Sequence, residues 1–323
     1  MNSSVLETKT IINLVTGGAG FLGSHLIDKL MLSNEKVICL DNFFTGDKSN
    51  ISKWQYHKNF EVINHDVTKP IKLEVDKIWH LACPASPVHY QRNPIKTSKT
   101  SFLGTYNMLD LAKGVGADFL LASSSEVYGD PTLIPQIEKS NGYLNTTGIR
   151  SCYEEGKRIA ETLCSDYKRI HNVDVKIMRI FNTYGPRMRP NDGRVISNFI
   201  VQALENKPIT IYGNGSQTRS FCYVDDLIEG MILLMNKKNV STPINLGNTE
   251  QVSILNLASK IKNLINPDLE FVFQPLPLDD RQKRQPCIEK AKAMLNWEPK
   301  TNLDEGIRKS IYWFQKYLME EQL

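Results

Sequence analysis

The sequence predicts an α/β fold in which a doubly wound parallel sheet is joined to a smaller C-terminal α/β part. Short β-branched runs alternate with longer amphipathic stretches as far as Ile180. A glycine-rich loop directly follows the first of these runs, and after residue 182 the elements become shorter and alternate with loops rich in Gly, Pro and Arg. Strand and helix patterns that alternate in this way are typical of a parallel sheet covered by helices on both faces.

The elements can be assigned in chain order from their length and periodicity. Continuous apolar runs too short for helices predict buried parallel strands at Ile11–Thr16, Lys36–Asp41, Phe60–His65, Lys77–Leu81, Asp118–Ala122 and Asp174–Ile180. Helical spacing of apolar residues predicts helices at Gly20–Met31, Ile95–Gly114, Ser151–His171 and, as the last element, Asp304–Tyr317.

Composition and charge exclude several classes of protein. The chain has 323 residues, of which 41% are hydrophobic and 23% charged, so it is neither disordered nor fibrous. Its net charge of +4 is too small to indicate a nucleic-acid partner. No apolar run approaches the roughly 18 residues of a membrane span. The first residues, MNSSVLETKT, lack the features of a signal peptide, and we expect residues 1–9 to be a mobile tail.

Cysteine and histidine usage indicates a reduced, metal-free protein. None of the six cysteines forms a CxxC pair, so we expect free thiols and a cytoplasmic location. The six histidines are scattered without the spacing of metal ligands, and we expect no metal site.

The glycine-rich loop indicates a dinucleotide site. Gly17, Gly20 and Gly23 occur in TGGAGFLG, between the first predicted strand and the first predicted helix. The first two would let the backbone turn tightly and approach a pyrophosphate, and Gly23 would let the helix pack close to the strand. Turns are also glycine-rich, so the triplet is informative only because of its place between strand and helix.

An acidic residue ends the second predicted strand. Asp41 lies about twenty residues past the glycine loop, where a carboxylate accepts hydrogen bonds from ribose hydroxyls and repels a 2′-phosphate. NAD is therefore favoured over NADP, although such an Asp can also cap a turn. Asp66, after the third strand, has the same two interpretations: an adenine contact or a turn residue.

A second group of residues carries proton-transfer chemistry. Tyr153 and Lys157 form YxxxK on one face of a predicted helix, where an ammonium group would lower the pKa of the phenol. The segment SSSEVYG places Ser124, Ser125 and Glu126 at the carboxyl end of the fifth strand. Each motif alone has a structural explanation, a chance helical pair or a Ser-rich turn. Together with the glycine loop and Asp41, they indicate an enzyme site.

Longer segments extend this pattern. TGGAGFLGSHL, DNFFTG, HLACPASP, LLASSSEVYGDP, YEEGKR, RIFNTYGPRM, YGNGSQTRSF and LNWEP occur in this order. The chain resembles the UDP-glucuronate decarboxylases of the extended short-chain dehydrogenase/reductase superfamily over residues 10–318. It differs at Cys83, where the family commonly has Ser, at Glu154 in place of Asp, and in NTTGIRS, which replaces a segment richer in Pro.

The resemblance implies a Rossmann-type NAD domain, residues 10–182 plus about 220–248, and a nucleotide-sugar domain, residues 183–219 plus 249–323. It implies proton transfer by Ser124, Tyr153 and Lys157, and it places Glu126 beside C5 of the sugar, with water or Ser125 assisting. It brings Arg284 to the sugar carboxylate, with Arg281 as the competitor for that role.

Binding residues follow from the same resemblance and from the preference of arginine for diphosphates and carboxylates. The cofactor set is Gly17, Gly20, Phe21, Leu22, Asp41, Asn42, Thr45, Gly46, Asp66, Val67, Leu81, Ala82, Tyr153 and Lys157. The substrate set is Lys99, Asn107, Asn182, Arg187, Arg194, Tyr212, Gln217, Arg219 and Arg284. Any one of these cations can also be an ordinary surface residue.

The implied reaction is NAD-dependent conversion of UDP-glucuronate to UDP-xylose through a UDP-4-keto intermediate, by a homodimer without nucleic-acid or membrane partners. Alternatives are a decarboxylase that releases the UDP-4-keto-pentose, and a UDP-hexose 4-epimerase or 4,6-dehydratase. Glu126 disfavours simple epimerisation, and Ser125 stands where a dehydratase often has an acid. A non-enzymatic NAD-sensing protein is a further alternative, which the intact Tyr153 and Lys157 disfavour.

Overall fold

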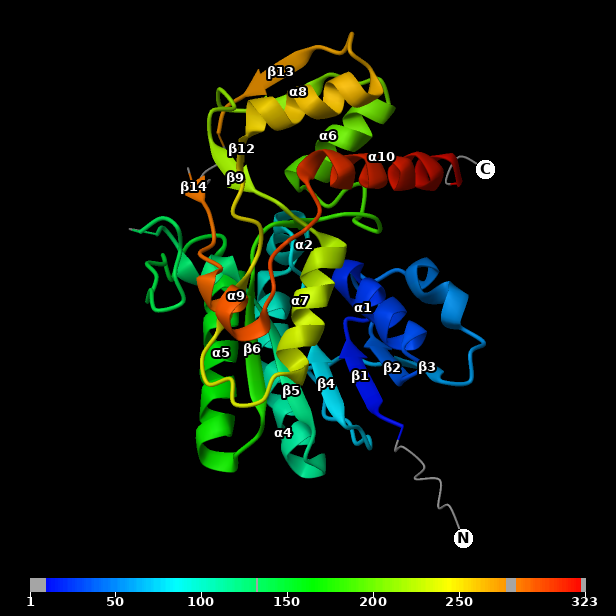
Figure 1. The fold of residues 1–323 in the computed structure, drawn as a ribbon, viewed down its shortest axis with the longest axis vertical. Helices are drawn as coiled ribbons and strands as arrows, with labels where there is room; N and C mark the ends of the chain where they lie inside the picture. The colour runs from blue at the N-terminus through cyan, green and yellow to red at the C-terminus, as the bar shows by residue number, and fades with distance from the viewer. Residues whose placement is uncertain (1–9, 132, 277–282, 321–323) are drawn as a thin grey trace.

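A seven-stranded parallel sheet forms the centre of the molecule (Figure 1). The computed structural model describes residues 10–131, 133–276 and 283–320. In sheet order the strands are β11 (Ile244–Leu246), β6 (Val175–Ile180), β5 (Asp118–Ser124), β4 (Lys77–His80), β1 (Ile12–Thr16), β2 (Lys36–Asp41) and β3 (Phe60–Asn64). The strand interiors are almost wholly buried in β1, β2, β4 and β5, because helices cover both faces.

The order in which strands are added to the sheet reverses between β1 and β4, although these two strands run parallel. From β1 the sheet continues through β2 and β3 to one edge, and from β4 it continues through β5, β6 and β11 to the other. Ligands of open α/β sheets bind outside the carboxyl ends of the strands at such a switch point. The fold therefore places a binding crevice above the ends of β1 and β4.

Helices pack on both faces of the sheet. On one face α1 and α7 contact each other, and on the other α4 and α5 contact β4, β5 and β6. The helices associated with the sheet are α1 (Phe21–Leu32), the 3₁₀ helix η1 (Lys48–Trp54), α2 (Pro87–Arg92), α3 (Pro94–Lys99), the π-helical turn η2 (Thr100–Gly104), α4 (Thr105–Val115), the 3₁₀ helix η3 (Ser125–Tyr128), α5 (Ser151–His171), α7 (Val224–Asn236) and α9 (Glu289–Leu295).

A second, smaller group of elements lies above the sheet in Figure 1. It contains α6 (Val195–Leu204), α8 (Ile254–Ile265), α10 (Leu303–Glu320), the parallel pair β8 (Ile209–Tyr212) and β13 (Phe271–Gln274), and the three-stranded sheet of β12 (Gln251–Ser253), β9 (Thr218–Ser220) and β14 (Lys283–Arg284). The pair β7 (Thr183–Tyr184) and β10 (Cys222–Tyr223) lies where the chain passes between the two groups.

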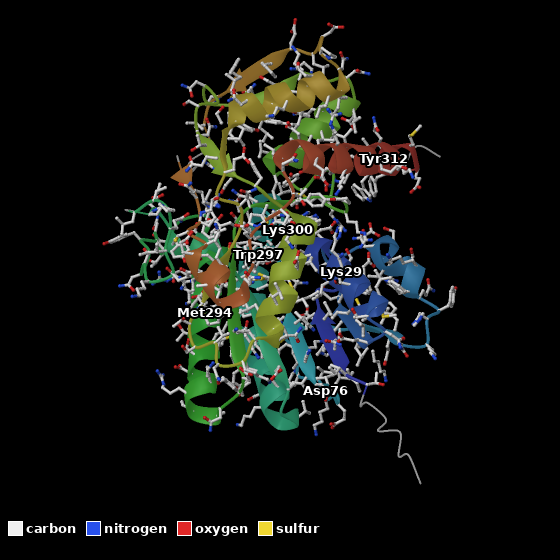
Figure 2. All side chains as sticks on the ribbon, viewed as in Figure 1. Lys29, Asp76, Met294, Trp297, Lys300 and Tyr312 are labelled. Atoms are coloured by element: carbon white, nitrogen blue, oxygen red, sulfur yellow. The ribbon has the colours of Figure 1, made fainter. Side chains whose placement is uncertain are left out.

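The segment between α9 and α10 ties this second group to the sheet. Trp297 and Lys300 lie beside α7 in Figure 2. The indole Nε1 of Trp297 donates to the carbonyl of Asp226 at 2.9 Å, and Lys300 Nζ is 2.9 Å from a carboxylate oxygen of Glu229. Trp297 is 2% exposed and packs against Gly230, where a Cβ would lie only 2.9 Å from the indole.

The predicted fold class is confirmed, and most predicted elements occur within two residues of their expected ends. The expected helix Ile95–Gly114 is one helical stretch made of α3, η2 and α4. The strand expected to end at Ala122 continues to Ser124, because Ser123 and Ser124 pair with Arg179 and Ile180 of β6. The expected mobile tail, residues 1–9, lies outside the described residues.

The domain boundaries remain a prediction. Within the range expected for the nucleotide-sugar domain, α9 packs against α7 and β11 of the sheet rather than against α6, α8 or α10 (Figure 1). No helix in the described part of the chain has both the length and the apolar character needed to cross a bilayer. Those residues also contain no group of three or more His, Cys, Asp or Glu side chains arranged to hold a metal ion.

Replacing Trp297 with Ala should lower the free energy of unfolding by about 3–5 kcal/mol, because a buried aromatic ring and its hydrogen bond are lost. Tyr312 on α10 is 60% exposed, and Tyr312→Ala should change that free energy by less than about 0.5 kcal/mol. Urea denaturation of both variants tests this contrast. Equal stability of the two variants would show that the α9–α10 segment does not hold the two groups together.

Candidate active site

A cavity of about 1020 Å³ opens above the carboxyl ends of the strands, between the sheet and the second group of elements. Its wall includes the loops after β1, β2, β4 and β5, the start of α5, and residues of β8 and β9. Typical small-molecule sites occupy roughly 300–1,000 Å³, so this cavity is at the upper end of that range.

The glycine loop occupies the cofactor end of this cavity. Gly17 has φ +68°, and a Cβ there would lie 2.9 Å from the backbone of Ala82. A Cβ on Gly23 would lie 2.2 Å from the carbonyl oxygen of Gly17, so α1 can pack this closely only without a side chain. Gly20 precedes α1 and offers no side-chain cap. The first N–H groups of α1 are therefore available to a phosphate.

Asp41 lies beside this loop at the end of β2. One carboxylate oxygen accepts from Ala19 N at 3.0 Å and the other from Phe43 N at 2.8 Å. Burial raises the pKa of this carboxyl, and the backbone hydrogen bonds oppose that rise. The side chain lines the cavity, and a Cβ on Gly46 would lie 2.8 Å from the carboxylate. Asp41 can therefore present its oxygens to ribose hydroxyls.

Most of the predicted cofactor residues lie in the cavity wall. Besides Asp41 and the catalytic pair, they are Gly17, Gly20, Phe21, Leu22, Asn42, Thr45, Val67, Leu81 and Ala82. Gly46 and Asp66 are not in the wall. Gly46 supports Asp41 from behind, and Asp66 accepts hydrogen bonds from Asn42 and Thr68. Capless helix N–H groups, close-packed glycines and a carboxylate at the strand end fit a dinucleotide such as NAD.

Tyr153 and Lys157 face the cavity from the first turns of α5. Ser124, at the end of β5, shares a hydrogen bond with the Tyr153 hydroxyl. Lys157 Nζ lies 5.8 Å from the centroid of the Tyr153 ring and donates to the Ala122 carbonyl at 2.8 Å. Tyr90 stacks on Tyr153 with ring centroids 5.1 Å apart and an interplanar angle of 6°. The reactive phenol is thus fixed on both sides.

One expectation about this group is wrong. Lys157 was expected to lower the pKa of Tyr153, but burial raises the pKa of the phenol above its usual value. The hydrogen bond from Ser124 and the charge of Arg194 only partly oppose this effect. Desolvation of the buried phenol is the main cause, and the ammonium group of Lys157 donates to the Ala122 carbonyl.

Glu126 is held by two arginines. Arg284 binds both of its carboxylate oxygens, Nη1 to Oε1 at 2.6 Å and Nη2 to Oε2 at 3.1 Å. Arg150 donates to Oε1 at 2.9 Å and also reaches Glu154 at 3.3 Å. Glu126 and Arg284 are buried, and both line the cavity. Charge-assisted bidentate contacts of this kind are among the strongest hydrogen bonds in proteins.

Backbone pairing brings Arg284 to this position. β14 pairs in parallel with β9, so that Arg284 lies opposite Arg219, and Ser220 donates to the Arg284 carbonyl at 3.4 Å. Arg281, the competitor proposed for the carboxylate, lies outside the described residues. The structure therefore pairs Arg284 with Glu126, while the choice between the two arginines as partner of a sugar carboxylate stays a prediction.

The predicted substrate residues divide into two groups. In addition to Arg284, the cavity wall contains Asn182, Arg187, Arg194, Tyr212, Gln217 and Arg219. Lys99 and Asn107 are not in the wall. Lys99 is exposed at the end of α3, and the Asn107 side chain donates to the Val67 carbonyl at 2.9 Å. Their assignment to the nucleotide sugar stays a prediction.

Lys96, Tyr90 and Arg150 are among the cavity residues that were not predicted. Lys96 lies one turn before Lys99, with its ammonium 4.3 Å from the Phe44 ring centroid. Tyr90 and Arg150 contact Tyr153 and Glu126 as described above. Arg150 stands three residues before Tyr153, which was a usable signal because it is nearly one helical turn away. Nothing in the local sequence marks Tyr90, which follows an ordinary Pro-rich loop.

The fold and this site define a class: dinucleotide-dependent enzymes that act on sugar nucleotides through a Tyr–Lys pair. The model of the NAD dependent epimerase/dehydratase family matches residues 13–247. The chain belongs to this family.

One curated relative and two solved structures show which members of the family this chain is similar to. The chain is 56% identical over 305 residues to UDP-glucuronic acid decarboxylase 1 of Xenopus tropicalis, covering 94% of this chain and 72% of that protein. Its fold is similar to an epimerase structure, Mth375 of Methanothermobacter thermautotrophicus, with a TM-score of 0.89, 27% identity and coverage of 97% and 94%. It is also similar to the UDP-glucuronic acid 4-epimerase of Bacillus cereus in complex with UDP-glucuronic acid and NAD, with a TM-score of 0.85, 28% identity and coverage of 95% and 100%.

Asp41→Ala should weaken NAD binding by about tenfold and reduce the preference for NAD over NADP, because one charge-assisted acceptor is lost and a repulsive charge is removed. Asp41→Asn keeps an acceptor oxygen, so its NAD affinity should lie between those of the wild type and Asp41→Ala. Titration calorimetry with both cofactors measures the ratio of the NAD and NADP affinities. An unchanged ratio in Asp41→Ala would make Asp41 a turn residue only.

Tyr153→Phe should reduce turnover by about 10²–10⁴-fold, because the phenol is the group placed to move the proton of a sugar hydroxyl. The ring, its stacking on Tyr90 and the cation set are kept, so the affinity for UDP-glucuronate should stay within about threefold of wild type. Steady-state rates together with equilibrium binding separate the two effects. Near-normal turnover would remove Tyr153 from the mechanism.

Proposed function

We propose that this protein converts UDP-glucuronate to UDP-xylose and CO₂ through a UDP-4-keto intermediate, with NAD regenerated in each turnover. The observation that carries the proposal is the position of Glu126, which two arginines hold in the same cavity as Tyr153, Ser124 and Lys157. The Tyr–Lys pair is what oxidation at a sugar hydroxyl requires. The carboxylate–guanidinium group adds chemistry for a carboxylated sugar.

The first step oxidises C4 of the sugar. NAD, when bound, supplies the hydride acceptor for C4 and returns the hydride later in the same turnover. Tyr153 removes the proton of the 4-hydroxyl, and Ser124 holds the phenol in place through their hydrogen bond. Lys157 lies one turn further along α5, where its ammonium group donates to the Ala122 carbonyl and lies 5.8 Å from the centroid of the Tyr153 ring. The sugar leaves this step as a β-keto acid.

Loss of CO₂ follows from the position of that ketone. When the C5–carboxylate bond breaks, its electron pair stays on C5 and delocalises into the C4 carbonyl, which gives an enolate. We assign Arg284 to orient the departing carboxylate, and its guanidinium group also binds Glu126. Orientation matters because the breaking bond must lie in line with the π system of the ketone.

The enolate then takes a proton at C5. Glu126, with Ser125 or a water molecule, is the acid–base group on this side of the cavity. Reduction at C4 completes UDP-xylose, with Tyr153 returning a proton to the oxygen. The atoms balance, because the carboxylate leaves as CO₂ and one solvent proton replaces it at C5.

The surface of the helices on one side of the sheet supports a homodimer. Large apolar side chains are exposed along α3, η2 and α4, at Ile95, Phe102 and Tyr106. On α5, Ile159 and Ile170 are also exposed. A second copy of the same helices would cover these residues through a two-fold interface. We also infer a cytoplasmic location, since all six cysteines are free thiols.

Reaction in D₂O tests the whole cycle. UDP-xylose formed by the purified protein should carry deuterium at C5, because that position takes a proton from an exchanging group, and ordinary hydrogen at C4, because that hydrogen is returned without exchange. NMR of the product measures both positions, and no reduced cofactor should accumulate in proportion to product.

Three other outcomes would contradict the proposal, each in a different way. UDP-galacturonate as the product would indicate the 4-epimerase activity named for the Bacillus cereus structure. A UDP-4-keto-pentose with equal amounts of reduced cofactor would show that the cycle stops half-way. Ordinary hydrogen at C5 would exclude protonation by an exchanging acid.

A further inference from the structure

The loop between β7 and α6 crosses the cavity. We call residues 186–194 the strap. Many of its side chains belong to the cavity wall: Arg187, Met188, Arg189, Asp192, Gly193 and Arg194. A loop of this kind has little secondary structure to hold it, so its position depends on contacts with the segments that it crosses.

The first anchor of the strap is α1, the helix that follows the glycine loop. Arg187 Nη2 donates to a carboxylate oxygen of Asp28 at 2.6 Å. His25 Nε2 lies 3.0 Å from the carbonyl of Pro186, and burial lowers the pKa of His25 to about 4. The imidazole is therefore neutral at physiological pH and donates to this carbonyl.

Two further anchors lie across the cavity. Arg189 Nη2 donates to the Gly46 carbonyl at 3.2 Å, in the segment that supports Asp41. Arg194 Nη2 donates to the Ala85 carbonyl at 3.0 Å, in the loop after β4. The strap is thus tied to the three segments, after β1, β2 and β4, that form the cofactor end of the cavity.

Arg187 has two features that its contact with Asp28 does not explain. Its backbone has φ +66°, which is uncommon for a residue with a side chain and is held only where the surroundings require it. Its second terminal nitrogen, Nη1, is buried without a hydrogen-bond partner. A buried guanidinium nitrogen in the wall of a dinucleotide site, on an arginine paired with Asp28 of α1, is available to donate to an anionic diphosphate.

We propose that the strap retains NAD through both hydride transfers, with the Arg187–Asp28 ion pair as its latch and Arg187 Nη1 as a donor to the cofactor diphosphate. Arg187 is thereby assigned to the cofactor rather than to the nucleotide sugar. The effect of cofactor retention on the product rests on the proposed function. A cofactor that leaves after C4 oxidation strands the UDP-4-keto-pentose, whereas a retained cofactor completes UDP-xylose.

Asp28→Asn tests the latch without touching the cavity, because Asp28 is not part of the wall. The rate constant for NAD dissociation, measured by displacement of bound cofactor, should rise about tenfold, the size expected for one lost charge-assisted hydrogen bond. The fraction of product released as UDP-4-keto-pentose should rise with it. Arg187→Met should show a larger increase in both, and Arg187→Lys an intermediate one.

Lys53→Met is the matched control. Lys53 Nζ is 2.9 Å from the same Asp28 oxygen, but it is half-exposed on η1 and belongs neither to the strap nor to the cavity wall. This variant should dissociate NAD within about twofold of the wild-type rate, as expected for a surface ion pair. Thermal melts of all variants identify any that fail to fold, and Arg187→Lys keeps the test open if Asp28→Asn is one of them.

The two measurements separate the claims. If folded Asp28→Asn and Arg187→Met release NAD at the wild-type rate, the strap does not retain NAD, whichever product is formed. If the wild-type chain makes no UDP-xylose, the proposed function fails, and the dissociation rates still decide whether the strap holds NAD. Faster dissociation without any change in the product ratio would overturn the link between retention and completion of the cycle.

Discussion

The contact between Glu126 and Arg284 is the interaction on which the site depends. The two residues are 158 positions apart, one just past the end of β5 and the other in β14 of the second group of elements. Their bidentate contact joins the sheet to the second group of elements in the wall of the cavity. It also places a carboxylate and a guanidinium group beside a Tyr–Lys pair, which by itself provides only for chemistry at a sugar hydroxyl.

A buried polar network fixes this contact. Asn245, at β11, accepts from the Tyr128 hydroxyl at 2.7 Å and donates to the carbonyls of Gln136 and Cys287 at 3.0 and 3.2 Å. Gln136 N in turn donates to the Gln285 carbonyl at 2.8 Å. Because Tyr128 ends η3 and Gln285 follows Arg284, the network links the backbones that carry both partners. Buried hydrogen bonds of this kind, which join distant segments, rigidify a site.

What the sequence could predict was local. Gly17, Asp41 and the Tyr153–Lys157 pair lie in motifs whose spacing has one physical meaning when strand and helix flank them. Tyr90 became visible only in the structure, because its role depends on stacking across 63 positions of chain that no local pattern records.

Other differences from the expected site have equally specific causes. Lys99 was expected in the substrate set, whereas the cavity wall contains Lys96, about one helical turn earlier. The expected low pKa of Tyr153 failed because burial and the direction of the Lys157 side chain are not written in the YxxxK spacing. Long-range pairing and desolvation are therefore what the sequence left undetermined.

We propose that Glu126, held by arginines, serves decarboxylation and not C4 oxidation. A single-turnover experiment with Glu126→Gln separates the two steps, because it follows the absorbance of the reduced nicotinamide and the release of labelled CO₂ in parallel. In this variant C4 oxidation should proceed within about threefold of the wild-type rate, while CO₂ release or completion of UDP-xylose should slow by about 10²-fold or more. Equal slowing of both steps, or of neither, would contradict it.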